Sequence, residues 1–135
     1  MSQESVELVR RIFEVWNGPE IGVDESVQEF FDPAIRMDLT GRKLNPAVYD
    51  GYEGITRFTA EVGEVWDDFR IELVELIDLA PCAVSVMRAV AQGRGSGVEV
   101  VGEMAWVWTV SDGRVVQVQG DFDRDAALEA AGLSE

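Results

Sequence analysis

The sequence has no histidine and a single cysteine, and both shortages exclude kinds of chemistry. Without histidine the protein cannot build Ser-His or Cys-His nucleophile systems, and it lacks the commonest ligand of zinc and non-haem iron sites. Any acid–base chemistry must use carboxylates, tyrosine, lysine or water. Cys82 has no partner for an intrachain disulfide, as is usual in a reducing compartment. We therefore expect a cytoplasmic protein with no metal and no cofactor.

Basic residues are also scarce, with 11 lysines and arginines against 26 acidic residues and a net charge of -15. This balance argues against nucleic acid or an anionic membrane as a partner. The N-terminus has no apolar signal core, and no run approaches the roughly 20 apolar residues that a membrane span needs. A length of 135 residues predicts one domain, residues 1–135.

Apolar residues recur at helical spacing in four segments of the chain. In the first, Val6, Val9, Phe13 and Trp16 recur every three or four residues. Asp123 is a good cap for the last, which Gly132 ends. The predicted elements are helices over residues 3–16, 24–31, 55–66 and 123–132, strands over 35–39 and 69–79, and a loop over 40–52.

Two tight-turn signals, Gly95-Ser96 and Asp112-Gly113, divide residues 82–122 into three long antiparallel strands. Two-residue turns fix the register by counting. They place Arg88 opposite Glu103 in the first hairpin and Val107 opposite Val118 in the second. The predicted fold class is α+β, with helices covering one face of an antiparallel sheet.

Successive side chains of these strands point to opposite faces of the sheet, and the two faces differ in their content of apolar side chains. One face is nearly all apolar apart from Arg88 and Glu103, so we expect the helices to cover it and to enclose a pocket there. The opposite face carries large side chains with a polar rim of glutamines. It is expected either to form a homodimer or to lie under the C-terminal helix; its large residues are Met87, Met104, Trp106 and Trp108.

Several segments together resemble the SnoaL-like branch of the nuclear transport factor 2-like superfamily. They are Trp-Asn after the first helix, Phe-Phe-Asp-Pro before a strand, Tyr-Asp-Gly-Tyr-Glu-Gly-Ile before a helix, Gly-Arg-Gly-Ser-Gly, Val-Trp-Thr-Val-Ser-Asp-Gly-Arg-Val and Phe-Asp-Arg. The resemblance implies a cone-shaped α+β barrel. Its N-terminal helices pack in the concave face of a curved, mainly antiparallel sheet, with a short C-terminal helix, a pocket at the open end and often a dimer across the outer sheet face.

The resemblance also bears on activity, because the superfamily includes ketosteroid isomerases, polyketide cyclases, epoxide hydrolases, dehydratases and members without chemistry. By position, Asp38 matches the general base of a ketosteroid isomerase, whereas Ile12 and Ala105 replace its two oxyanion-stabilising donors. Losing one such donor typically costs about a hundredfold in rate. Steroid isomerisation by that mechanism is therefore excluded, and polyketide cyclase-like or epoxide hydrolase-like proton transfer stays open.

The catalytic candidates are carboxylates and one arginine. Asp38 is either a general base, if desolvation raises its pKa, or a cap for the loop that follows it. Arg88 and Glu103 either steer a polar substrate group or simply neutralise each other across the hairpin. Asp121 is predicted to face outward, although a one-residue bulge would turn it inward.

We predict that the pocket binds a small apolar molecule. If the protein is an enzyme, a carbonyl or polyketide-like compound would react there by cofactor-independent proton transfer. The alternative is a non-catalytic binding or dimerisation module with a vestigial pocket. The predicted ligand wall consists of Trp16, Met37, Tyr49, Phe58, Trp66, Val86, Ala105, Val107 and Phe122.

Overall fold

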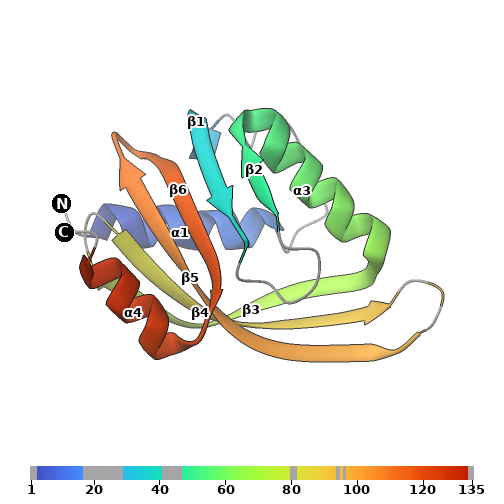
Figure 1. Cartoon of the computed structure of the whole chain (residues 1–135). Coiled ribbons are helices and arrows are strands. Elements are labelled where there is room, and N and C mark those ends of the chain that lie inside the picture. Colours follow the sequence, from blue (N-terminus) through green and yellow to red (C-terminus); the bar gives the residue numbers. More distant parts are fainter. Residues whose placement is uncertain are drawn as a thin grey trace.

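The structure, a computed structural model, describes residues 3–16, 29–40, 47–79, 82–93, 95 and 97–133. Its helices and strands follow the order expected of an α+β domain, with the long strands in the C-terminal half (Figure 1). The elements are α1 (Gln3–Trp16), β1 (Phe31–Asp38), β2 (Val48–Asp50), α3 (Gly51–Val65), β3 (Trp66–Leu79), β4 (Cys82–Gly93), β5 (Glu99–Ser111), β6 (Arg114–Phe122) and α4 (Arg124–Leu133).

The six strands form one mixed sheet in the order β2-β1-β6-β5-β4-β3. Only the β1–β6 pair is parallel, and the other neighbours are antiparallel. Helices α1 and α3 pack on one face, the inner face, and α4 packs on the other, the outer face (Figure 1). The predicted α+β fold is therefore confirmed. Among the described residues, no helix combines the length and hydropathy that crossing a bilayer requires.

Local sequence explains where several elements begin and end. Helix α1 covers the predicted residues 3–16. The Asp123 carboxylate caps α4 as predicted, because its Oδ1 accepts a hydrogen bond of 2.7 Å from the Ala126 amide. The turn between β5 and β6 also matches, since Asp112 and Gly113 both have positive φ, as a two-residue hairpin turn requires.

Several boundaries differ from the prediction, among them the start of β3, which is Trp66 instead of residue 69. Strand β1 begins at Phe31 instead of residue 35, because its pairing with β6 is irregular between Phe31 and Arg36, and such an irregularity tolerates Pro33. The expected loop over 40–52 contains β2, and α3 starts at Gly51. In α3, Gly54 packs so closely on β2 that an added Cβ would lie 2.8 Å from the carbonyl carbon of Tyr49. The predicted helix over 24–31 falls mostly outside the described residues.

The register of the first hairpin is as predicted, with Arg88 opposite Glu103 and Val84 opposite Val107. The second hairpin matches only next to its turn. A register shift between Thr109 and Val110 leaves one extra residue in β6, so Val107 pairs with Gln119 instead of Val118. The bulge places Val118 beside Trp108 on the inner face.

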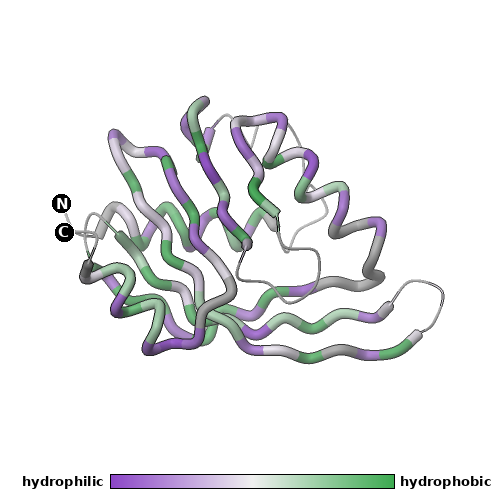
Figure 2. The backbone as a smooth tube through the Cα atoms, in the orientation of Figure 1, coloured by the Kyte–Doolittle hydropathy of each residue, from purple (hydrophilic) through white to green (hydrophobic). Residues whose placement is uncertain are grey.

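The alternation along the strands is correct, but the assignment of its two sides was reversed. Trp106, Trp108 and Met87 lie in the main core with α1 and α3. Ala105 and Val107 lie in a smaller cluster under α4. Figure 2 shows hydrophobic and hydrophilic positions following one another along the strands. Both faces are apolar where helices cover them, so the size of the side chains distinguishes the two faces. The indoles fill the space under α1 and α3 on the inner face. The small residues of the outer face let the alanines of α4 approach the sheet closely.

Candidate functional site

Five aromatic side chains from four elements form a continuous series of ring contacts on the inner face, which we call the aromatic row. Neighbouring ring centroids lie 5.5 to 6.1 Å apart, within the range of favourable aromatic pairs. The row joins β2 to α3, crosses β5 and ends on α1. In order, its members are Tyr49, Phe58, Trp106, Trp108 and Phe13.

The position of Trp106 depends on a glycine in the neighbouring strand. A Cβ at Gly120 would meet Cδ2 of Leu39 and lie 2.8 Å from the indole Nε1 of Trp106. Only a residue without a side chain leaves room for the ring at this point of β6. Gly120 thus leaves the space on the inner face that the Trp106 ring, the middle member of the aromatic row, occupies.

A buried polar contact lies beside the row. The Trp108 indole Nε1 donates a hydrogen bond of 2.8 Å to the Ser85 hydroxyl, and neither residue has measurable exposure. Ser85 lies on β4 directly opposite Trp106 on β5. The serine therefore adds a hydroxyl to an otherwise apolar surface.

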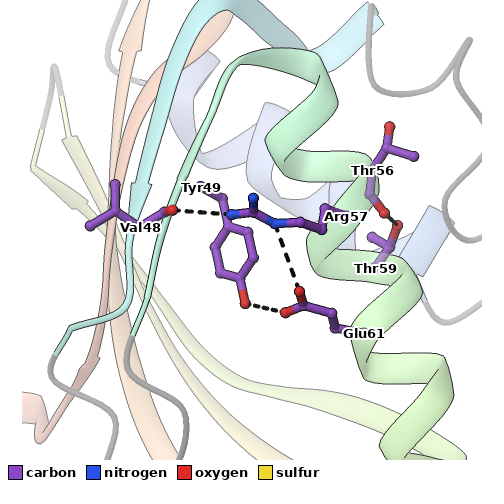
Figure 3. A network of polar contacts seen from close by, with 6 residues as sticks. All are labelled: Val48, Tyr49, Thr56, Arg57, Thr59 and Glu61. Atoms are coloured by element: carbon purple, nitrogen blue, oxygen red, sulfur yellow. Dashed lines mark hydrogen bonds and ion pairs between the residues drawn. The ribbon is translucent and has the colours of Figure 1, made fainter.

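The Tyr49 end of the row is also polar (Figure 3). The Tyr49 hydroxyl donates a hydrogen bond of 2.6 Å to Oε1 of Glu61 on α3. The Arg57 guanidinium lies 4.8 Å over the Tyr49 ring, 3.7 Å from Glu61, and donates to the carbonyl of Val48. These contacts fasten β2 to α3 and fix the tyrosine ring.

Asp38 has the geometry of a loop cap. Its Oδ1 accepts hydrogen bonds from the amide and the hydroxyl of Thr40, at 3.0 and 2.6 Å. These bonds, the hydroxyl first, hold the pKa of Asp38 below its ordinary value, and the nearby Arg36 lowers it further. The raised pKa that a general base would need is thus not present.

No group of three or more acidic, cysteine or histidine side chains suited to a metal ion occurs among the described residues. The sequence model of the SnoaL-like domain matches residues 9–118, which is most of the chain. The chain belongs to the SnoaL-like family.

Solved structures of similar fold match this SnoaL-like domain over nearly its full length. A putative SnoaL-like polyketide cyclase from Jannaschia sp. CCS1 is 20% identical, with a TM-score of 0.76 and coverage of 96% of this chain and 92% of its own. A ketosteroid isomerase-like protein from Catenulispora acidiphila DSM 44928, in complex with trimethylamine, is 13% identical, with a TM-score of 0.74 and coverage of 93% and 92%.

A third structure is that of TerC co-crystallised with polyporic acid, which is 18% identical, with a TM-score of 0.73 and coverage of 96% of this chain and 98% of its own. At these identities the likeness establishes the fold alone. No curated protein matches the sequence.

Two of the predicted catalytic residues of the SnoaL-like domain do not line its inner face. Arg88 and Glu103 face each other across β4 and β5, as predicted, but both are exposed on the outer side of the sheet. The expectation of a charged pair inside a dry pocket was wrong, because it followed from the reversed assignment of the two faces.

The predicted ligand wall divides into three sets. Met37, Tyr49 and Phe58 are buried in the main core of the inner face. Val86, Ala105 and Val107 lie on the outer side with α4, which corrects their placement. The side chains of the others lie outside those that the structure describes, as does that of Asp121; they are Trp16, Trp66 and Phe122.

The predicted dimer patch is also wrong as a surface. Met87, Trp106 and Trp108 are at most 4% exposed, and Met104 packs against the same core. A homodimer remains a prediction without an assigned surface.

Sequence reasoning missed the inward role of both indoles, and with it Phe13, Ser85 and Glu61. One signal was available for the serine, which is the sole polar residue in the run Cys82 to Met87. In the predicted register Ser85 lies opposite Trp106, and Trp108 is two residues further along the same strand, so all three side chains belong to one face of the sheet. No comparable signal marks Glu61, which reaches Tyr49 only because α3 packs closely on β2.

Proposed function

We propose that this SnoaL-like protein binds a small, largely apolar, planar molecule against the aromatic row. The supporting observation is the row itself, in which rings from β2, α3, β5 and α1 meet on one face of the sheet. Ligand sites are typically lined by aromatic side chains with a few placed polar groups. Ser85 and the Tyr49–Glu61 pair supply such groups.

Small molecules accompany two of the neighbouring structures, which agrees with a ligand of small size. Polyporic acid accompanies TerC, and trimethylamine accompanies the Catenulispora protein. The net charge of -15 disfavours strongly anionic ligands.

The proposed activity is binding and not proton abstraction by Asp38. Its carboxylate already accepts two hydrogen bonds from Thr40, and its pKa is lowered. The expected steering residues, Arg88 and Glu103, are exposed on the opposite face. Binding therefore requires fewer rearrangements than catalysis with this residue set.

One observation favours the alternative of a module with a filled, vestigial pocket. Trp106 and Trp108 themselves occupy the inner face and are 4% and 0% exposed. In that case the row is a packed core, and no ligand enters it.

A titration with two small bicyclic compounds, indane and 1-indanone, separates these functions. The indole N–H signals of the protein are followed by ¹⁵N NMR, and Trp106 and Trp108 are assigned by Trp→Phe variants. Binding predicts saturable shifts of both signals with a Kd of about 1 mM or tighter, as expected for ligands of about ten non-hydrogen atoms. Trp106→Leu should weaken binding about tenfold.

Val101→Ala is the control, because Val101 is 47% exposed on β5, outside the main core. It should leave both titrations unchanged. Absence of saturable shifts at the two indoles would refute ligand binding at the row and favour the filled core.

A further inference from the structure

Ser85 has a hydrogen-bonding capacity that its described surroundings do not use. A serine hydroxyl accepts through oxygen and also donates its proton. Here the oxygen accepts the Trp108 N–H at 2.8 Å. Among the described residues, the Ser85 proton has no acceptor, although the side chain is fully buried.

Buried donors without a partner are rare in folded proteins, and such a donor usually binds a water molecule or a ligand or has another functional reason. The site of this donor is unusual as well. Ser85 pairs with Leu76 on β3 and Trp106 on β5, so its hydroxyl lies on the inner face beside the aromatic row.

We infer that Ser85 donates its proton to an acceptor oxygen of the bound molecule, so that this serine selects ligands that carry such an oxygen beside their rings. The inference rests on the proposed function, that is, on a ligand at the aromatic row. Because Trp108 donates into the same oxygen, the indole polarises the hydroxyl and makes it a better donor. The Trp108 N–H donates to the Ser85 oxygen, and the Ser85 O–H in turn donates to the ligand oxygen.

This arrangement also selects between classes of ligand. An aromatic hydrocarbon fits the rings but leaves the Ser85 proton unpaired, and an alkylammonium ion offers no acceptor at all. A ketone satisfies both the rings and the hydroxyl, so the oxygen contributes specificity. A site with a buried donor rejects analogues that lack the acceptor.

The experiment compares 1-indanone with indane, which share a ring system and differ by the carbonyl oxygen. Isothermal titration measures both compounds against the wild type, Ser85→Ala and Thr59→Val. Thr59→Val is the matched control: it also removes a buried hydroxyl, but one that donates at 2.9 Å to the Thr56 carbonyl within α3. The indane affinity of each variant reports whether the aromatic row is intact.

The wild type should bind 1-indanone about tenfold more tightly than indane, the usual gain from one buried hydrogen bond. Ser85→Ala should lose that preference and keep the indane affinity, whereas Thr59→Val should retain both. Equal affinities for the two compounds in the wild type, or an unchanged preference in Ser85→Ala, would overturn the inference and leave ligand binding standing. If neither compound binds the wild type, the proposed function fails and this inference fails with it.

Discussion

The phenolic hydroxyl of Tyr49 on β2 donates a 2.6 Å hydrogen bond to the Glu61 carboxylate on α3. The tyrosine is 1% exposed, whereas the Glu61 side chain is 47% exposed, so the bond links the buried end of the aromatic row to the surface. The Arg57 guanidinium covers the same ring. These contacts hold the short strand β2 against α3.

Removing the Tyr49 hydroxyl should destabilise the protein moderately. Tyr49→Phe loses one hydrogen bond to a charged group, while water can still solvate Glu61, so the free energy of unfolding should fall by about 1 to 2 kcal/mol. Urea denaturation measures the change. Tyr52→Phe is the control, because the Tyr52 hydroxyl has no hydrogen bond among the described residues, and it should change stability by less than about 0.5 kcal/mol. Equal effects of the two variants would contradict the structural role of the bond.

Adding a methyl group at Gly120 should disturb the aromatic row. In Gly120→Ala the new Cβ meets Leu39 and the Trp106 indole, so the free energy of unfolding should fall by about 1 to 3 kcal/mol. Thermal unfolding and the indole N–H NMR signal of Trp106 follow the change. Gly102→Ala is the matched substitution in β5, where nothing lies within 4 Å of the added Cβ, and it should be close to neutral. A neutral Gly120→Ala would show that Trp106 does not pack against β6.

These residues show how far sequence reasoning reached. The turn at Asp112-Gly113, the register of the first hairpin and the Asp123 cap depend on neighbouring residues, and all three are confirmed. The identity of the inner face depends on where helices pack. With α4 covering Ala105 and Val107, both faces of β5 are apolar, so hydropathy alone does not distinguish them.

The errors at the site have two sources, that ambiguity of the two faces and the register of the second hairpin. Two irregularities in the second hairpin, between Thr109 and Val110 and between Ala105 and Val107, shifted its register by one residue and then by a second, which no turn rule predicts. Arg88 and Glu103 were paired correctly but assigned to the wrong side. The two faces differ in side-chain volume, which the prediction from polarity did not consider. The inner face carries Trp106 and Trp108, and the outer face carries small residues.

The ion pair between Arg124 and Glu75 should make stability depend on pH. Two contacts of 2.8 and 3.1 Å join the start of α4 to β3, and the hydrogen bond from Arg124 lowers the pKa of Glu75 below 4.5. A lowered carboxyl pKa gives stability that is present above pH 4.5 and lost as the pH falls through the folded-state value. The stability difference between wild type and Arg124→Gln should therefore be larger at pH 7 than at pH 3, in urea unfolding at both values.

Arg114→Gln provides the comparison, since no ion pair of Arg114 occurs among the described residues. It should show no such pH-dependent difference. A stability difference for Arg124→Gln that persists at pH 3 would contradict a contribution from the charged Glu75.

The pKa of Asp38 should rise when Thr40 loses its hydroxyl. In Thr40→Val the 2.6 Å bond disappears and the backbone bond remains, so the shift should be partial and directed toward the ordinary value of 3.8. NMR titration of the Asp38 carboxyl carbon measures it. An unchanged pKa would show that the threonine hydroxyl does not hold the carboxylate.

The position of β3 at the end of the sheet has a consequence for the protein in concentrated solution. Its pairing with β4 is interrupted between Asp67 and Arg70 and again between Leu73 and Glu75, and acidic side chains recur along it. Breaks and charges of this kind make a strand a poor template for another polypeptide. Growth of fibrils by strand addition at this border of the sheet is thereby discouraged.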